Sequence, residues 1–158
     1  MDNEEVSVIA VDDNRQYTDL VEEFLNQELD VEVDQYQDPE NVVSDIGNGV
    51  SISDYDIVIS DWNMGRMNGG ELGREIRKHS DIPIIYFTSE EKSGIDEVIA
   101  DVGANYLHKE EFGRLSEEVK DLLIKRRESE DAVQGYAGNW DTTVTETESD
   151  EKEKYIDS

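Results

Sequence analysis

The sequence predicts an α/β fold in which five parallel strands form one doubly wound sheet with helices on both faces. Short apolar runs rich in β-branched residues alternate five times with segments whose apolar residues recur at helical spacing. Strands that alternate with helices in this way pair in parallel and are connected by right-handed crossovers. The chain of 158 residues suits one domain of ordinary size with some length to spare.

The first half of the chain holds two strands and two helices. Val6–Val11 is an apolar run typical of a buried strand, and apolar residues at helical spacing predict a helix over Arg15–Glu28. Val31–Tyr36 alternates apolar and polar residues, as a strand near a sheet edge does. A capping carboxylate followed by Pro39 starts a short helix that ends near Ile46.

The second half repeats this alternation around the central buried strand Asp56–Ser60. Gly94 lies near the start of a weak helical segment, which we expect to be mobile. The predicted elements that follow the central strand are a helix over Glu71–Lys78, a strand over Ile82–Phe87, a weaker helix over Glu90–Asp101, a strand over Ala104–His108 and a helix from Leu115 to about Arg127.

The C-terminal segment differs in composition from the rest of the chain. Residues 1–127 are expected to form the folded domain. Residues 128–158 are acidic and nearly free of clustered apolar residues, which predicts a disordered tail. Tyr136 and Trp140 are large anchors within it, so the alternative is a docked segment around them.

Charge and composition exclude several classes of function. The formal net charge is -27, from 41 acidic and 14 basic residues, and such a field repels nucleic acid and anionic membranes. The chain has no Cys, which excludes disulfides and thiolate metal sites. The sequence lacks an apolar run of about 20 residues, so we expect a cytoplasmic protein that neither binds DNA directly nor enters a membrane. Its acidity resembles that of halophilic proteins from salt-loaded cytoplasm.

Reactive side chains follow four of the five predicted strands. In the flavodoxin-like strand order 2-1-3-4-5, the first and third strands are neighbours. This order brings Asp12 and Asp13, after the first strand, close to Asp61, after the third. Three adjacent carboxylates need a compensating cation, and Mg²⁺ is suited to a few carboxylate ligands. Thr88 and Lys109, at the ends of the fourth and fifth strands, supply a hydroxyl and an ammonium for an anion built on Asp61, as phosphoryl transfer to an aspartate requires.

These motifs resemble the receiver domain of two-component response regulators, most closely the single-domain chemotaxis type, over roughly residues 6–127. The motifs that carry the resemblance are, in chain order, Asp12–Asp13, Asp61–Trp62–Asn63–Met64, Thr88–Ser89 and Tyr106–Leu107–His108–Lys109.

The resemblance implies a phosphoacceptor and a metal site. Asp61 would accept a phosphoryl group from a phosphohistidine on a sensor histidine kinase or a histidine phosphotransfer protein. Asp13, Asp61 and the main-chain carbonyl of Asn63 would bind Mg²⁺ directly, and Asp12 would act mostly through water. The protein would then catalyse its own aspartyl phosphorylation and dephosphorylation.

The resemblance also implies how the signal is formed and lost. Thr88 and Lys109 would bind the phosphoryl oxygens, and Tyr106 would be the aromatic switch that turns inward when Thr88 moves. Asn63 and Glu90 lie beside the path of the attacking water, so they would modulate the rate of dephosphorylation.

Two residues depart from the family pattern. Gly65 stands where such regulators usually carry Pro after Met64, which predicts a looser loop after the phosphoacceptor. Glu110 follows Lys109 where Pro is usual, so the cis peptide of the family becomes doubtful here.

Alternation along the fifth strand points His108 away from Lys109, which indicates a structural role.

With this resemblance, the favoured hypothesis is a phosphorylation-controlled module that switches a protein-binding face for a downstream target, with a homodimer formed on phosphorylation as a further expectation. The alternative is a phosphorelay intermediate or phosphate sink, in which transfer itself is the function. A transcriptional regulator ranks last, because the tail is too short and too acidic for a helix-turn-helix.

Overall fold

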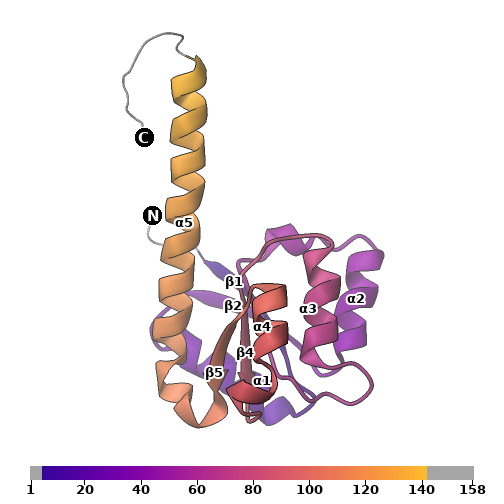
Figure 1. Cartoon of the computed structure of the whole chain (residues 1–158). Helices are drawn as coiled ribbons and strands as arrows, with labels where there is room; N and C mark the ends of the chain where they lie inside the picture. The colour runs from indigo at the N-terminus through magenta and orange to yellow at the C-terminus, as the bar shows by residue number, and fades with distance from the viewer. Residues whose placement is uncertain (1–4, 142–158) are drawn as a thin grey trace. The chain divides into compact units, whose positions relative to one another are not determined.

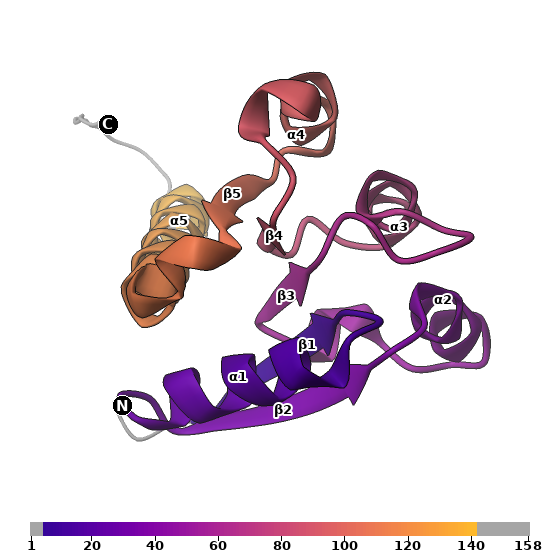
Figure 2. The ribbon, with the colours of Figure 1, turned by 90° about the horizontal axis from the view of Figure 1, so that it is seen from below.

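The computed structural model describes the backbone of residues 5–141 and the side chains of residues 5–130. It confirms one sheet of five parallel strands in the order β2-β1-β3-β4-β5 (Figures 1 and 2). β1 therefore lies between β2 and β3, as the prediction of neighbouring first and third strands requires. The strands are β1 (Val6–Val11), β2 (Val31–Tyr36), β3 (Ile57–Ser60), β4 (Ile84–Thr88) and β5 (Asn105–His108).

Helices cover both faces of the sheet. α2, α3 and α4 lie on one face, and α1 with the first turns of α5 lies on the other (Figure 2). The α-helices are α1 (Arg15–Asn26), α2 (Pro39–Gly47), α3 (Gly69–Arg77), α4 (Asp96–Val102) and α5 (Leu115–Asp141). Three short 3-10 helices cover Ile52–Asp54, Lys92–Gly94 and Lys109–Arg114.

Side-chain caps explain where most of these helices begin. The Asn14 side chain accepts from the N–H of Gln16 at the start of α1, and Asp38 caps α2. Asn68 and Glu71 form a capping box at α3, which starts two residues before the predicted position. α4 has no side-chain cap, and it begins at Asp96, well after the predicted start.

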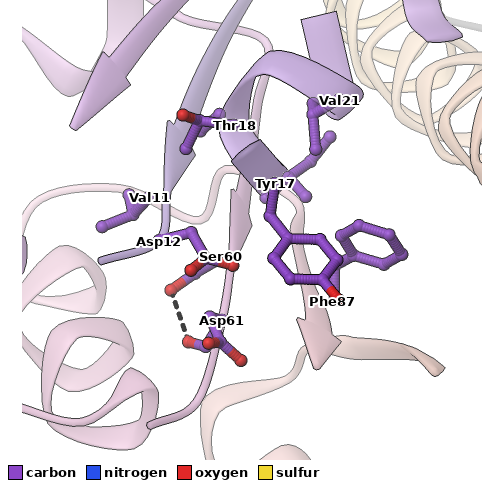
Figure 3. Close-up of a pocket in the computed structure, with 10 residues that line it drawn as sticks. Val11, Asp12, Tyr17, Thr18, Val21, Ser60, Asp61 and Phe87 are labelled. Carbon is purple, nitrogen blue, oxygen red and sulfur yellow. Dashed lines mark hydrogen bonds between the residues drawn. The ribbon is translucent and has the colours of Figure 1, made fainter. Parts of the chain in front are cut away.

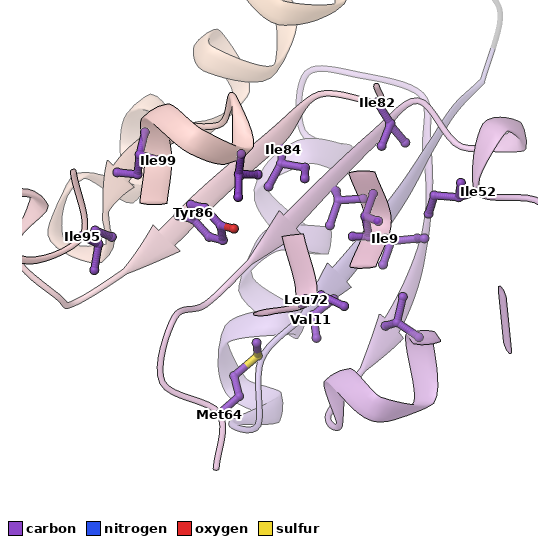
Figure 4. Close-up of a cluster of buried hydrophobic side chains, with 14 residues drawn as sticks. Ile9, Val11, Ile52, Met64, Leu72, Ile82, Ile84, Tyr86, Ile95 and Ile99 are labelled. Atoms are coloured by element: carbon purple, nitrogen blue, oxygen red, sulfur yellow. The ribbon is translucent and has the colours of Figure 1, made fainter. Parts of the chain in front are cut away.

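The larger part of the core lies between the sheet and helices α2 to α4 (Figure 4). Alternation along β4 places Ile84 and Tyr86 in this cluster, while Phe87 meets the ring of Tyr17 in α1. On the α1 side, the Ser116 hydroxyl of α5 donates to the main-chain oxygen of Phe24 at 3.1 Å. The sheet is thus buried on both faces, as its continuous apolar strands predict.

The end of α5 corrects one expectation. The helix continues to Asp141, so the predicted helix end near Arg127 is wrong. No Pro interrupts this stretch, and Arg126 pairs with Glu130 one turn later, so helix propagation continues without a regular apolar face. Residues 142–158 lie outside the described part of the chain.

The chain divides into two compact units. The first, Met1–Leu122, contains the sheet, and the second is Leu123–Ser158. Among residues 5–141, the helices lack the combination of length and apolarity that a membrane span requires.

Candidate functional site

Three carboxylates meet at the carboxyl ends of β1 and β3. One oxygen of each of Asp12, Asp13 and Asp61 lies within 4.8 Å of the others. Backbone hydrogen bonds hold them there: the N–H of Asp61 donates to Val11 O at 2.9 Å, and that of Asp12 donates to Tyr36 O at 3.0 Å. Strand pairing thus continues one residue beyond the strands and fixes the two buried carboxylates, while Asp13 is exposed.

Lys109 supplies the positive charge of this cluster. Its Nζ lies 2.8 Å from Asp12 and 3.2 Å from Asp61, and its side chain is buried. Burial by itself would lower the pKa of Lys109, but the hydrogen bonds and charges of Asp12 and Asp61 raise it above the usual value. Burial raises the pKa of Asp12 against the lowering effect of Lys109.

The carboxylate of Asp61 is held at both of its oxygens. The N–H of Trp62 donates to Oδ1 at 2.7 Å, and Lys109 lies at Oδ2. With three carboxylates and one ammonium, the site keeps two negative charges in excess. This oxygen donor set fits a hard divalent cation such as Mg²⁺, which Asp12, Asp13 and Asp61 would hold.

Thr88 and Tyr106 are connected through Glu90. Thr88 is buried at the end of β4, and its hydroxyl accepts from the N–H of Glu90 at 3.2 Å. The Tyr106 hydroxyl donates to the main-chain oxygen of the same residue at 2.6 Å. Burial, together with the charge of Glu91, raises the pKa of Tyr106. Thr88, the predicted phosphoryl ligand, and Tyr106, the predicted switch residue, therefore both contact the backbone of Glu90.

The two residues expected beside the water path contact each other. The side-chain amide of Asn63, in the segment after β3, donates to the carboxylate of Glu90, in the segment after β4. The predicted site residues at and after the strand ends thus gather at one edge of the sheet, and Tyr106, within β5, reaches this edge through its bond to Glu90.

The two departures from the family pattern have visible structural consequences. Gly65 adopts a left-handed conformation with φ of 86°, and the loop is closed by a 2.8 Å bond from the N–H of Gly69 to Trp62 O. The peptide bond between Lys109 and Glu110 is trans, as are the others in residues 5–141. His108 Nδ1 accepts from the N–H of Glu110 at 3.1 Å, which is the structural role that alternation indicates.

Two tyrosines at the site were not among the predicted site residues. The ring of Tyr17 lies 3.7 Å from Lys109 Nζ, measured to the ring centroid, and meets Phe87 edge-on (Figure 3). Tyr86 lies two residues before Thr88 and donates its hydroxyl to Gly69 O. The sequence signals these tyrosines only weakly: Tyr17 lies near Asp13, and Tyr86 lies near Thr88. An aromatic residue at either position would also be expected in an ordinary hydrophobic core.

Comparison with known proteins agrees with this arrangement. The family model for the response regulator receiver domain matches residues 8–120. The chain belongs to this family. Phosphorylation-controlled switching is the general role of receiver domains, which generally bind Mg²⁺ at an acidic pocket and interact with histidine kinases and downstream targets.

Relatives of this receiver domain include chemotaxis regulators. A chemotaxis protein CheY homolog of Campylobacter jejuni subsp. jejuni is 40% identical over 77 residues, which are 44% of this chain and 58% of the relative. The matched region thus spans 58% of the length of that relative.

Solved receiver domains share the fold. One from Clostridium thermocellum has a TM-score of 0.68 at 19% identity, with 77% of this chain and 97% of that chain covered. A CheY-like receiver from Methanospirillum hungatei has a TM-score of 0.69 at 19% identity, with coverages of 80% and 99%.

Proposed function

We propose that this receiver domain takes a phosphoryl group onto Asp61 from a phosphohistidine and thereby switches a protein-binding face. The observation that carries the proposal is the Lys109 ammonium, which bridges Asp12 and Asp61 within a cluster of three carboxylates. A carboxylate nucleophile beside a fixed cation is an arrangement suited to phosphoryl transfer.

Each site residue has a defined part in the proposed transfer. An Asp61 oxygen attacks phosphorus, the phosphorus–nitrogen bond of the donor imidazole breaks, and the nitrogen keeps the electron pair. Lys109 and the Thr88 hydroxyl neutralise and hydrogen-bond the phosphoryl oxygens. Bound Mg²⁺ would supply further charge neutralisation, with Asp13, Asp61 and the Asn63 carbonyl as direct ligands and Asp12 acting mostly through water.

The output of the proposed switch passes through Glu90. A phosphoryl group that accepts a hydrogen bond from the Thr88 hydroxyl would draw this side chain toward Asp61, away from the N–H of Glu90 that now donates to it. Tyr106 is bonded to the carbonyl of that same residue, so movement at Thr88 would change the surface around Tyr106 and α4. This connection favours a downstream protein target over a relay intermediate. A homodimer formed on phosphorylation and a cytoplasmic location remain part of the proposal.

Labelling of the acceptor tests the proposal. Wild-type protein incubated with acetyl phosphate and Mg²⁺ should gain an acid-stable, hydroxylamine-labile phosphoryl group, and Asp61→Asn should gain none. Asp121→Asn is the matched control, because Asp121 is exposed on α5. Undiminished labelling of Asp61→Asn would exclude this acceptor. Rapid reversible transfer to a histidine phosphotransfer protein, without a phosphorylation-dependent target, would favour the relay.

A further inference from the structure

We propose that Tyr17 is a positioning residue that holds the Lys109 ammonium through the face of its aromatic ring. An ammonium has three N–H donors, and Asp12 and Asp61 lie within 2.8 and 3.2 Å of Lys109 Nζ. The centroid of the Tyr17 ring lies 3.7 Å from the same atom, well within the range of a cation–π interaction. The inference rests on the proposed function, in which Lys109 binds the phosphoryl group.

The fold places the Tyr17 ring firmly. Tyr17 lies in the first turn of α1, which follows directly on the acidic pair. The N–H of Asn14 donates to Asp12 Oδ1 at 2.9 Å, and the Asn14 side chain then caps the helix. The ring also packs edge-on against Phe87, with centroids 6.4 Å apart (Figure 3). The ring position is therefore determined by the same segment that holds Asp12.

The surroundings make this contact stronger than one at the surface. The Lys109 side chain is only 8% exposed, so little water competes for the ammonium. Cation–π contacts gain strength when they are desolvated in this way.

Tyr17 differs from the other two partners of Lys109 because it is uncharged. Asp12 and Asp61 are also the groups that a divalent cation and a phosphoryl group would engage, so their hold on Lys109 must weaken during the reaction. The ring face takes no part in those interactions. Tyr17 therefore keeps the ammonium beside Asp61 while its carboxylate partners change.

Progressive fluorination of the ring tests this role without changing its shape greatly. Tyr17 is replaced by phenylalanine and then by its 4-fluoro, 3,5-difluoro and 3,4,5-trifluoro derivatives, and the initial rate of Asp61 phosphorylation by acetyl phosphate is measured with Mg²⁺. Each fluorine withdraws charge from the ring face, so the rate should fall stepwise, by about fivefold across the series. Tyr17→Phe should stay near the wild-type rate, and Tyr17→Leu should lose about tenfold.

The same series at Phe112 is the matched control, because that ring contacts Phe24. Its rates should not change. A second readout needs no phosphorylation: the side-chain protons of Lys109 near Nζ should show an upfield ring-current shift in the NMR spectrum that Tyr17→Leu abolishes. Flat rates at position 17, or equal declines at both positions, would overturn the role of Tyr17. Failure of wild-type Asp61 to be labelled would instead overturn the proposed function.

Discussion

The Tyr86 hydroxyl donates a 2.7 Å hydrogen bond to the main-chain oxygen of Gly69, which joins β4 to the first residue of α3. Gly69 in turn donates its N–H to Trp62 O, and the Trp62 ring meets Tyr86 edge-on with centroids 5.3 Å apart. Trp62 follows the proposed phosphoacceptor directly. Tyr86 therefore braces the segment after Asp61 from within the core, where the usual Pro is replaced by Gly65.

Removal of this hydroxyl should cost stability. Tyr86→Phe keeps the ring but deletes the donor, so the free energy of unfolding at pH 7 should fall by about 1 kcal/mol. Urea denaturation of the two proteins measures the difference. An unchanged midpoint would show that the Tyr86–Gly69 bond contributes nothing net.

The same pair of proteins should respond differently to alkali. Burial raises the pKa of Tyr86 to about 12, above the value near 10 of an unfolded chain. Between these values the unfolded state loses its proton first, so the wild type should lose about 2 to 3 kcal/mol of stability as pH rises from 10 to 12. Tyr86→Phe lacks this loss and should become the more stable protein near pH 12. Tyr36 and Tyr55 are present in both proteins and cancel in the comparison. A constant difference over this range would contradict the prediction.

Gly73 in α3 should resist substitution because of Tyr86. A Cβ atom there would clash with the Tyr86 hydroxyl oxygen and would lie 3.0 Å from a methyl carbon of Val102. Gly73→Ala should therefore destabilise by about 1 to 3 kcal/mol, despite the higher helix propensity of Ala. Gly47→Ala is the control, since a Cβ in that helix would meet nothing within 4 Å, and it should be neutral or stabilising. Equal thermal midpoints for the two variants would show that the Tyr86 side chain moves away from the added methyl group at little cost in stability.

Much of the site could be predicted because strand ends fix positions in space. β1 and β2 have the predicted bounds, and parallel pairing alone brings Asp12 and Asp13 to Asp61. The residues that follow each strand therefore indicate the site even where the predicted bounds of the intervening helices are wrong.

The parts that could not be predicted depend on contacts between distant segments or on weak local signals. Tyr17 meets Lys109 only because α1 lies against the face toward which Lys109 points. The sequence alone does not distinguish Tyr86 from a core aromatic residue without a hydrogen bond to Gly69. α4 lacks a capping side chain to mark its start. α5 continues beyond Arg127, although its regular apolar spacing ends there.

The proposed metal site predicts a fluorescence response from Trp62. In a Trp140→Phe background, Mg²⁺ should change the Trp62 emission with a dissociation constant in the millimolar range, as expected for a hydrated site with few carboxylates. Asp13→Ala should weaken binding about tenfold or more, because it leaves two carboxylates that Lys109 already engages. Asp121→Ala should bind like the background protein. An unchanged titration of Asp13→Ala would show that the metal binds elsewhere.

The charge of the chain predicts stabilisation by salt. With a formal net charge of -27, self-repulsion opposes the compact state, and added ions screen it. The thermal midpoint should rise markedly as KCl increases from dilute buffer to molar concentrations. NaCl should act in the same way, since screening does not distinguish the two cations. A midpoint that is independent of salt would show that the acidic residues repel one another little in the folded state.

The lifetime of the phosphorylated state should depend on Asn63. Its amide donates to the Glu90 carboxylate, and the two side chains come from segments that flank the proposed phosphoacceptor. An acyl phosphate is lost when water attacks phosphorus in line with the Asp61 oxygen, so groups beside that path can orient or exclude the water. Asn63→Arg replaces the amide with a larger cation that should exclude the water and pair with the phosphoryl group.

We expect Asn63→Arg to lengthen the lifetime about tenfold, which corresponds to about 1.4 kcal/mol in the barrier. The measurement is the loss of labelled Asp61 after removal of the donor, with Mg²⁺ present. Asn63→Ala separates the two effects, because it removes the bond to Glu90 without adding a cation. If Asn63→Ala decays as slowly as Asn63→Arg, orientation of water by the amide matters more than its exclusion. If wild type and Asn63→Arg decay at one rate, the pair formed by Asn63 and Glu90 does not border the path of attack.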